Sequence, residues 1–154
     1  MAVTVGSTAP DFTLRGWYSG VSEFALSSQR GRPIVLAFYA ADESLVCTRQ
    51  LCTYSDEIAD LHLFDATVWG ISPQGVESHE KFAGARRLKM PLLSDPDQQV
   101  ARAYGVVGPL GLRRSVFIVD AAGRVAWRRV TAIGVTYPSA ADIRVALAAL
   151  PPAA

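Results

Sequence analysis

The sequence predicts an α/β domain with a mixed central sheet flanked by helices. Apolar runs of strand length at residues 34–39 and 66–71 are each followed by a segment with helical spacing, which is typical of parallel strands joined by helices. Nearer the C-terminus, residues 115–120 and 125–131 flank a short turn ending in glycine, which predicts an antiparallel hairpin. The chain has 154 residues, 50% hydrophobic and 19% charged, so we expect a single domain over residues 1–154 with a substantial core.

The N-terminal half begins with two alternating segments, residues 11–14 and 22–26, which predict a hairpin. The run at 34–39 is apolar on both faces, as expected for a strand in the middle of a covered sheet. A helix is expected across 46–62, and a second buried strand over 66–71.

The C-terminal half adds a helix of mixed polarity at 75–88, a short strand starting at 92–93, and a helical turn or two within 97–104. A last helix is expected over 139–150, with Ser139 as its N-cap. The complete order of elements resembles the thioredoxin fold with an N-terminal β-hairpin extension.

Composition excludes several classes of function. A formal net charge of +1 gives no electrostatic case for binding nucleic acid or an anionic membrane, and no apolar run approaches the ~20 residues of a membrane span. The first residues lack a secretory signal, so a cytoplasmic protein with reduced thiols is expected. Two cysteines are too few for a disulfide scaffold. His79 and His62 are expected at the surface or a helix edge, and Asp42 as a solvated charge at a helix end.

Cys47 and Cys52 are the only cysteines of the chain, and they follow the strand at 34–39 at the expected start of a helix. A thiol in that position lies near unpaired backbone N–H groups and the positive end of the helix dipole, which favour the thiolate. A reactive cysteine with a second one nearby indicates redox chemistry.

The segment around Cys47 resembles the active-site segment of the peroxiredoxins, thiol peroxidases with the signature PxxxTxxC. The aligned positions are Ala40, Ser44 and Cys47, so alanine replaces the proline while serine keeps the hydroxyl of the threonine. The flanking stretches APDFTL and RSVFIVDAAG also follow the family pattern, and the resemblance spans roughly residues 3–150. The five-residue step from Cys47 to Cys52 resembles the bacterioferritin-comigratory-protein, or Q-type, branch.

The resemblance implies a thiol-dependent peroxidase without metal, haem or flavin. Cys47 would be oxidised by peroxide to sulfenic acid, Cys52 would convert this to an intramolecular disulfide, and an external dithiol such as thioredoxin would reduce it. Ser44 would hydrogen-bond the peroxide oxygens.

The family pattern also places an arginine three residues before a strand phenylalanine, which selects Arg114, ahead of Phe117, over its neighbour Arg113. Its permanent charge would lower the thiol pKa and its N–H groups would donate to both thiolate and peroxide. Gln50, one turn after the first cysteine, is expected to orient this arginine.

The spacing of Cys47 and Cys52 predicts a motion. On an ideal helix, residues i and i+5 have Cα atoms roughly 8–9 Å apart and point to different sides, whereas a disulfide needs less than ~7 Å. The start of this helix must therefore unwind before the two sulfurs can bond.

Other interpretations stay open at this point. A redox sensor or holdase-like module would use the same cysteines with little turnover, and a disulfide oxidoreductase is disfavoured because no C-x-x-C pair is present. Ala40 restores backbone freedom where the family has proline, so a looser pocket is hypothesised. The preferred peroxide is not defined, and a monomer or weak dimer is expected.

Overall fold

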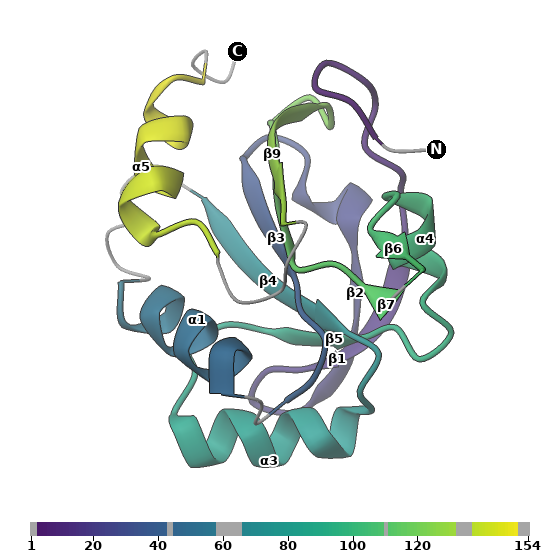
Figure 1. Cartoon of the computed structure of the whole chain (residues 1–154), viewed down its shortest axis with the longest axis vertical. Coiled ribbons are helices and arrows are strands. Elements are labelled where there is room, and N and C mark those ends of the chain that lie inside the picture. The colour runs from purple at the N-terminus through teal and green to yellow at the C-terminus, as the bar shows by residue number, and fades with distance from the viewer. Residues whose placement is uncertain (1–2, 43–44, 58–65, 110, 132–136, 151–154) are drawn as a thin grey trace.

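The computed structural model describes residues 3–42, 45–57, 66–109, 111–131 and 137–150. Its centre is a seven-stranded sheet with the strand order β2-β1-β5-β4-β3-β8-β9 (Figure 1). Strands β3, β4 and β5 run parallel, whereas β1 and β8 pair antiparallel with their neighbours, so the sheet is mixed as predicted.

The elements have the following bounds. The main sheet contains β1 (Thr13–Trp17), β2 (Val21–Ala25), β3 (Ile34–Phe38), β4 (Thr67–Ser72), β5 (Leu92–Ser94), β8 (Ser115–Val119) and β9 (Val125–Val130). The helices are η1 (Leu26–Gln29), α1 (Leu45–Asp56), α3 (Val76–Arg86), α4 (Gln99–Ala103) and α5 (Ala140–Ala148), and a separate two-stranded ribbon joins β6 (Val107–Gly108) to β7 (Gly111–Leu112).

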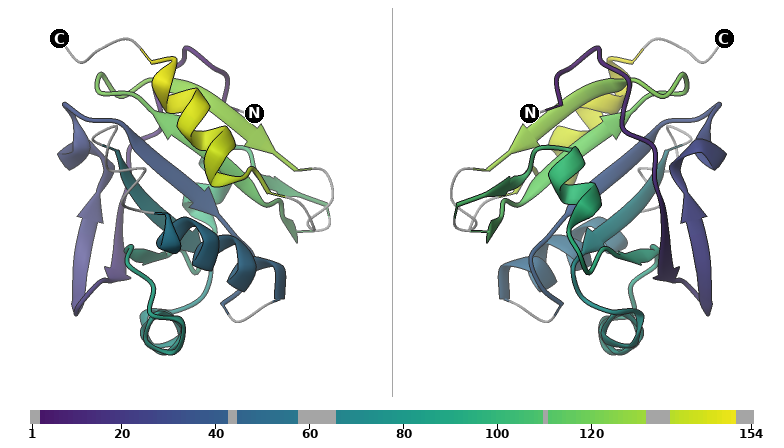
Figure 2. Two further views of the ribbon diagram at one scale, coloured as in Figure 1. Left: turned by 90° about the vertical axis from the view of Figure 1, so that its left-hand side faces the viewer. Right: turned by 90° about the vertical axis from the view of Figure 1, so that its right-hand side faces the viewer.

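The central strand β3 contributes to two cores because its side chains alternate between the faces of the sheet. Val35 and Ala37 lie in a core shared with α1, α3 and α5, and Ile34, Leu36 and Phe38 lie in a second core shared with α4. The two side views show α1 and α5 covering one face and α4 the other (Figure 2). Every residue of β3 is buried, which explains its unbroken apolar sequence.

The N-terminal hairpin is part of the main sheet, because β1 pairs with β5 through Gly16–Leu93 and Trp17–Leu92. Gly16 allows this approach: a Cβ atom there would stand 2.8 Å from the Leu92 carbonyl oxygen. The predicted hairpin is thus confirmed, and it occupies one edge of the sheet.

Most predicted elements are confirmed within two residues at each boundary. The helix expected over 46–62 is α1, which runs from Leu45 to Asp56; Glu57 is already a turn residue, so the helix ends earlier than predicted, and positions 58–62 lie outside the described residues. Ser139 caps α5 in a capping box with Asp142, as its place before the helix predicted. Strands β6 and β7 were not predicted, because two residues are too few to show a period. No helix within the described ranges is long and apolar enough to cross a bilayer.

Candidate active site

The site begins where the buried strand β3 gives way to α1. Cys47 lies in the first turn of this helix, where backbone N–H groups have no partner within the helix and the dipole is positive. This end of the sheet, beyond the carboxyl ends of parallel strands, is where open α/β folds place their ligands. Ser44 and the side chain of Cys47 lie outside the described residues.

Arg114 stands immediately before β8, and only 6% of its surface is exposed. Its Nη1 donates to Gln50 Oε1 at 2.7 Å, and Gln50 is itself fully buried one helical turn after Cys47. The structure therefore brings the predicted arginine to α1, through the glutamine expected to orient it. The neighbouring Arg113 is exposed.

The contact continues as a chain of hydrogen bonds, here called the arginine chain, that consists of Arg114, Gln50, Tyr54 and Pro138. Gln50 Nε2 donates to the Tyr54 hydroxyl at 3.3 Å, and that hydroxyl donates to the Pro138 carbonyl at 2.6 Å. Burial raises the pKa of Tyr54, although the Gln50 hydrogen bond acts in the opposite direction, so the phenol stays protonated and able to donate. The carbonyl of Pro138 directly precedes the N-cap of α5, so the chain joins three parts of the fold.

Cys52 lies half-buried on the same continuous helix as Cys47 and packs against the core shared by α1, α3 and α5. Because α1 is helical from Leu45 to Asp56, the two cysteine Cα atoms are separated by five helical residues, roughly 8–9 Å. That separation exceeds the reach of a disulfide.

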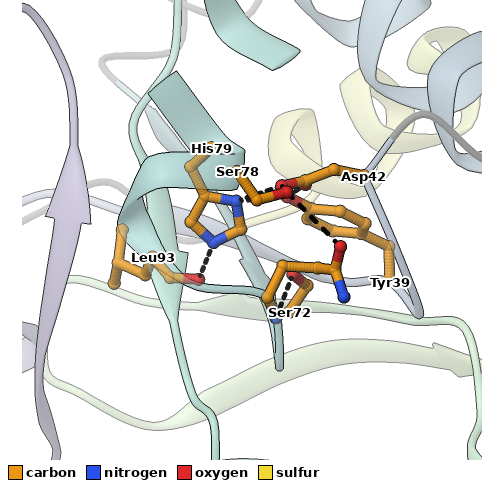
Figure 3. A network of polar contacts seen from close by, with 7 residues as sticks. Tyr39, Asp42, Ser72, Ser78, His79 and Leu93 are labelled. Atoms are coloured by element: carbon orange, nitrogen blue, oxygen red, sulfur yellow. Dashed lines mark hydrogen bonds and ion pairs between the residues drawn. The ribbon is translucent and has the colours of Figure 1, made fainter. Parts of the chain in front are cut away.

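A second polar network, here called the Asp42 network, consists of Tyr39, Asp42, Ser78 and His79 and lies between β3 and α3 (Figure 3). Asp42 Oδ2 is 2.8 Å from His79 Nδ1 and accepts from Ser78 Oγ at 2.7 Å, while Oδ1 accepts from the Tyr39 hydroxyl at 2.6 Å. The other ring nitrogen of His79 is 2.9 Å from the Leu93 carbonyl oxygen.

The expectation that His79 and Asp42 are solvated was wrong. The side chains of the pair are 0% and 2% exposed, respectively. Burial by itself raises the pKa of Asp42, but the hydrogen bonds from His79, Ser78 and Tyr39 outweigh it and the net shift is downward. Asp42 is therefore an ionised carboxylate at neutral pH.

A signal for the buried histidine was present in the sequence. His79 precedes Phe82 and Ala83 by three and four residues, and all three are buried on one face of α3. A histidine at core spacing on an amphipathic helix indicates burial and hence a polar partner. The partner itself comes from a distant segment and could not be read from this spacing.

The described residues contain no group of three or more histidine, cysteine, aspartate or glutamate side chains placed to hold a metal ion. The polar groups of the site are instead a buried guanidinium, an amide, a phenol and a carboxylate–imidazole pair.

Fold and site together define a thioredoxin-like domain in which Cys47 lies in the first turn of a helix that also holds the partner of a buried arginine, an arrangement that fits a thiol-dependent peroxidase. The model of the AhpC/TSA family matches residues 5–128, and the chain belongs to this family. A putative peroxiredoxin of Mycobacterium tuberculosis is 36% identical over 131 residues, covering 80% of this chain and 82% of the relative. Peroxiredoxin Bcp of Bacillus subtilis is 34% identical over 140 residues, covering 84% and 88%.

Solved structures agree with this placement. Peroxidoxin BcpB of Mycobacterium tuberculosis superimposes with a TM-score of 0.78 at 30% identity, and 95% of each chain is covered. Peroxiredoxin Q of Xanthomonas campestris gives a TM-score of 0.83 over 96% of each chain, and at 24% identity this likeness shows the shared fold. The relatives are peroxiredoxins, and the chain is an enzyme of this class, a thiol-dependent peroxidase.

Proposed function

We propose that the chain reduces hydrogen peroxide and organic hydroperoxides with Cys47 as the attacking thiolate, Arg114 and Ser44 as hydrogen-bonding groups at the peroxide, and Cys52 as the resolving thiol. The observation that carries this proposal is the buried Arg114, held by Gln50 one turn after Cys47 on α1. A guanidinium remains charged at every physiological pH, and burial strengthens its attraction for a thiolate.

In the first step, the Cys47 thiolate attacks one oxygen of the peroxide and the O–O bond breaks. The sulfur becomes sulfenic acid, and the other oxygen leaves as hydroxide or alkoxide and takes up a proton. Donors from Arg114 and Ser44 stabilise the negative charge that moves from sulfur to the leaving oxygen.

In the second step, the Cys52 thiolate attacks the sulfenic sulfur, the S–O bond breaks as the disulfide forms, and the hydroxide that leaves takes up a proton to become water. Described contacts fix the far end of α1: Tyr54 donates to Pro138, and Ser55 Oγ accepts from the Lys89 N–H at 2.7 Å. Since this end is anchored, we propose that the first turns of α1 unwind to bring Cys47 to Cys52.

A dithiol such as thioredoxin then reduces the disulfide by exchange.

The relatives that share this fold include Peroxiredoxin Bcp, a bacterial protein. On this basis we propose a cytoplasmic enzyme of one domain that works as a monomer or weak dimer.

Mass spectrometry of the reduced chain after one equivalent of hydrogen peroxide tests the assignment. We expect a loss of two hydrogens, with a peptide containing Cys47 linked to Cys52. Cys47→Ser should abolish peroxide consumption, and Cys52→Ser should complete one turnover and stop at the sulfenic acid. Peroxide consumption by Cys47→Ser at the parent rate would overturn the proposal.

Steady-state consumption of hydrogen peroxide with thioredoxin separates an enzyme from a peroxide sensor. Many turnovers per chain are expected. A single turnover with the disulfide left unreduced would favour the sensor.

A further inference from the structure

We propose that the Asp42 network is a positioning device for Cys47: it fixes residues 39–42, which follow β3, and so sets the balance between reaction with peroxide and opening of the helix. The inference rests on the proposed function. It concerns residues that act through the position of Cys47.

The proton positions follow from the partners of His79. The Leu93 carbonyl oxygen can only accept, so Nε2 must carry a proton. Nδ1 faces the Asp42 carboxylate at 2.8 Å, so both ring nitrogens of His79 have a polar partner and the ring is held from two sides.

The network fixes both sides of an exposed bend. Tyr39 and Asp42 lie on either side of Ala40, where alanine stands in place of the family's proline. The two side chains are hydrogen-bonded to each other, and Asp42 also contacts His79 on α3. Figure 3 shows their side chains converging on His79 from the β3 side. Gly70 on β4 leaves room for this arrangement, since a Cβ atom there would stand 3.2 Å from Tyr39 Cε1. The anchored Asp42 lies five residues before Cys47, so its position limits where α1 can begin.

Stability alone does not account for the network. A buried ion pair is often no more stabilising than apolar residues of the same volume, and its strict geometry favours a defined position. Here that geometry acts on the end of α1 that must be ordered for attack on peroxide and disordered for disulfide formation. Weakening the network is therefore expected to slow the attack of Cys47 on peroxide and to speed the unwinding of the first turns of α1.

Tyr39→Phe and Tyr104→Phe form a matched pair that tests this effect. Both tyrosines are fully buried; the Tyr39 hydroxyl donates to Asp42, whereas the Tyr104 hydroxyl donates to the Pro10 carbonyl at 2.8 Å in the other core. Tyr39→Phe should lower the second-order rate of the reduced chain with hydrogen peroxide roughly fivefold, because a hydrogen bond to a charged group is lost. It should also lower the fraction of Cys47 overoxidised to sulfinic acid, because the sulfenic acid reaches Cys52 sooner. Tyr104→Phe should leave both values at those of the parent.

Two substitutions at His79 separate position from folding. His79→Asn keeps an N–H donor near the place of Nδ1, facing Asp42, whereas His79→Gln keeps one near the place of Nε2, facing Leu93. Both lose one buried contact, so similar melting temperatures are expected. Only His79→Gln, which loses the donor facing Asp42, should show both the lower rate with peroxide and the lower overoxidation expected of Tyr39→Phe.

Equal peroxide rates and equal overoxidation in Tyr39→Phe, Tyr104→Phe and both His79 variants would overturn the positioning role. That result would leave the proposed function intact, because the function depends on Cys47 and is tested separately with Cys47→Ser.

Discussion

The arginine chain and the Asp42 network are two buried polar systems, one anchored on α1 and the other just before it in the chain, and they hold a charged group in different ways. In the arginine chain, a permanent cation is hydrogen-bonded to an amide, which in turn donates to a phenol that donates to a carbonyl. In the Asp42 network, a carboxylate faces an imidazole ring at 2.8 Å.

The difference indicates different tasks. A neutral amide orients the Arg114 guanidinium without cancelling its charge, which suits a group that must stabilise a thiolate or a leaving oxygen. In the Asp42 network, the carboxylate oxygens are held by an imidazole, a hydroxyl and a phenol at 2.6–2.8 Å, which gives a strict local geometry. The first system therefore suits chemistry and the second suits position.

The largest effect is expected from Arg114→Lys, which tests whether the arginine chain serves chemistry. Lysine keeps the charge but lacks the fixed planar set of donors, so it cannot reproduce the geometry with which the guanidinium would contact Gln50 and the peroxide. The second-order rate with hydrogen peroxide, measured by stopped flow, should fall by about 100-fold or more. A rate within threefold of the parent would contradict the role given to the guanidinium.

Asp42→Asn tests the charge balance of the second network. Removing one partner of a buried ion pair should lower the free energy of unfolding by ~3 kcal/mol at neutral pH. The pKa of Asp42 is lowered in the folded state from its ordinary 3.8, so the parent has this stabilisation above that pH and loses it as the pH falls through the folded pKa. Urea unfolding of both proteins across the acid range should show the difference shrinking. A difference that stays constant down to the acid transition would show that charge is not its cause.

Gln50→Leu removes the neutral acceptor and keeps Arg114. The guanidinium then loses this hydrogen bond, and the peroxide rate should fall roughly tenfold. Tyr54→Phe, one hydrogen bond further along the chain, should lower it only about threefold, because the Gln50 amide still accepts from Arg114. A larger loss of peroxide rate in Tyr54→Phe than in Gln50→Leu would contradict the proposal that Gln50 is the residue that orients Arg114 directly.

The smallest effect is expected from Glu57→Gln, which compares the buried networks with a surface ion pair. Glu57 and Arg144 join the end of α1 to α5 at 3.4 Å, and their side chains are 41% and 34% exposed. Solvent screening should limit the change in the free energy of unfolding to about 0.5 kcal/mol, with no change in the peroxide rate. A loss of unfolding free energy comparable to that of Asp42→Asn would show that solvent exposure does not predict the strength of ion pairs in this chain.

The contrast between the two networks also explains which residues of the site could be predicted from the sequence. Arg114, Gln50 and the two cysteines stand at positions that a family pattern marks, so each could be selected by spacing. Asp42 and His79 belong to no such pattern here, and each resembles an ordinary surface charge when its immediate neighbours are considered. The helical spacing of His79 with Phe82 indicates burial, but Asp42 and His79 stand 37 positions apart in the chain, so their contact cannot be read from local spacing.

The sequence by itself determined most of the strands and helices and marked Cys47 as the candidate for the attacking thiol. These depend on local patterns: apolar runs such as β3, the alternation of strands with helices, and a cysteine where a helix begins. The tertiary structure alone decided the partners of the buried polar groups, because a hydrogen bond between distant segments depends on how the sheet and helices pack. It placed the buried His79 against Asp42 and connected Arg114 to the start of α5 through Gln50 and Tyr54.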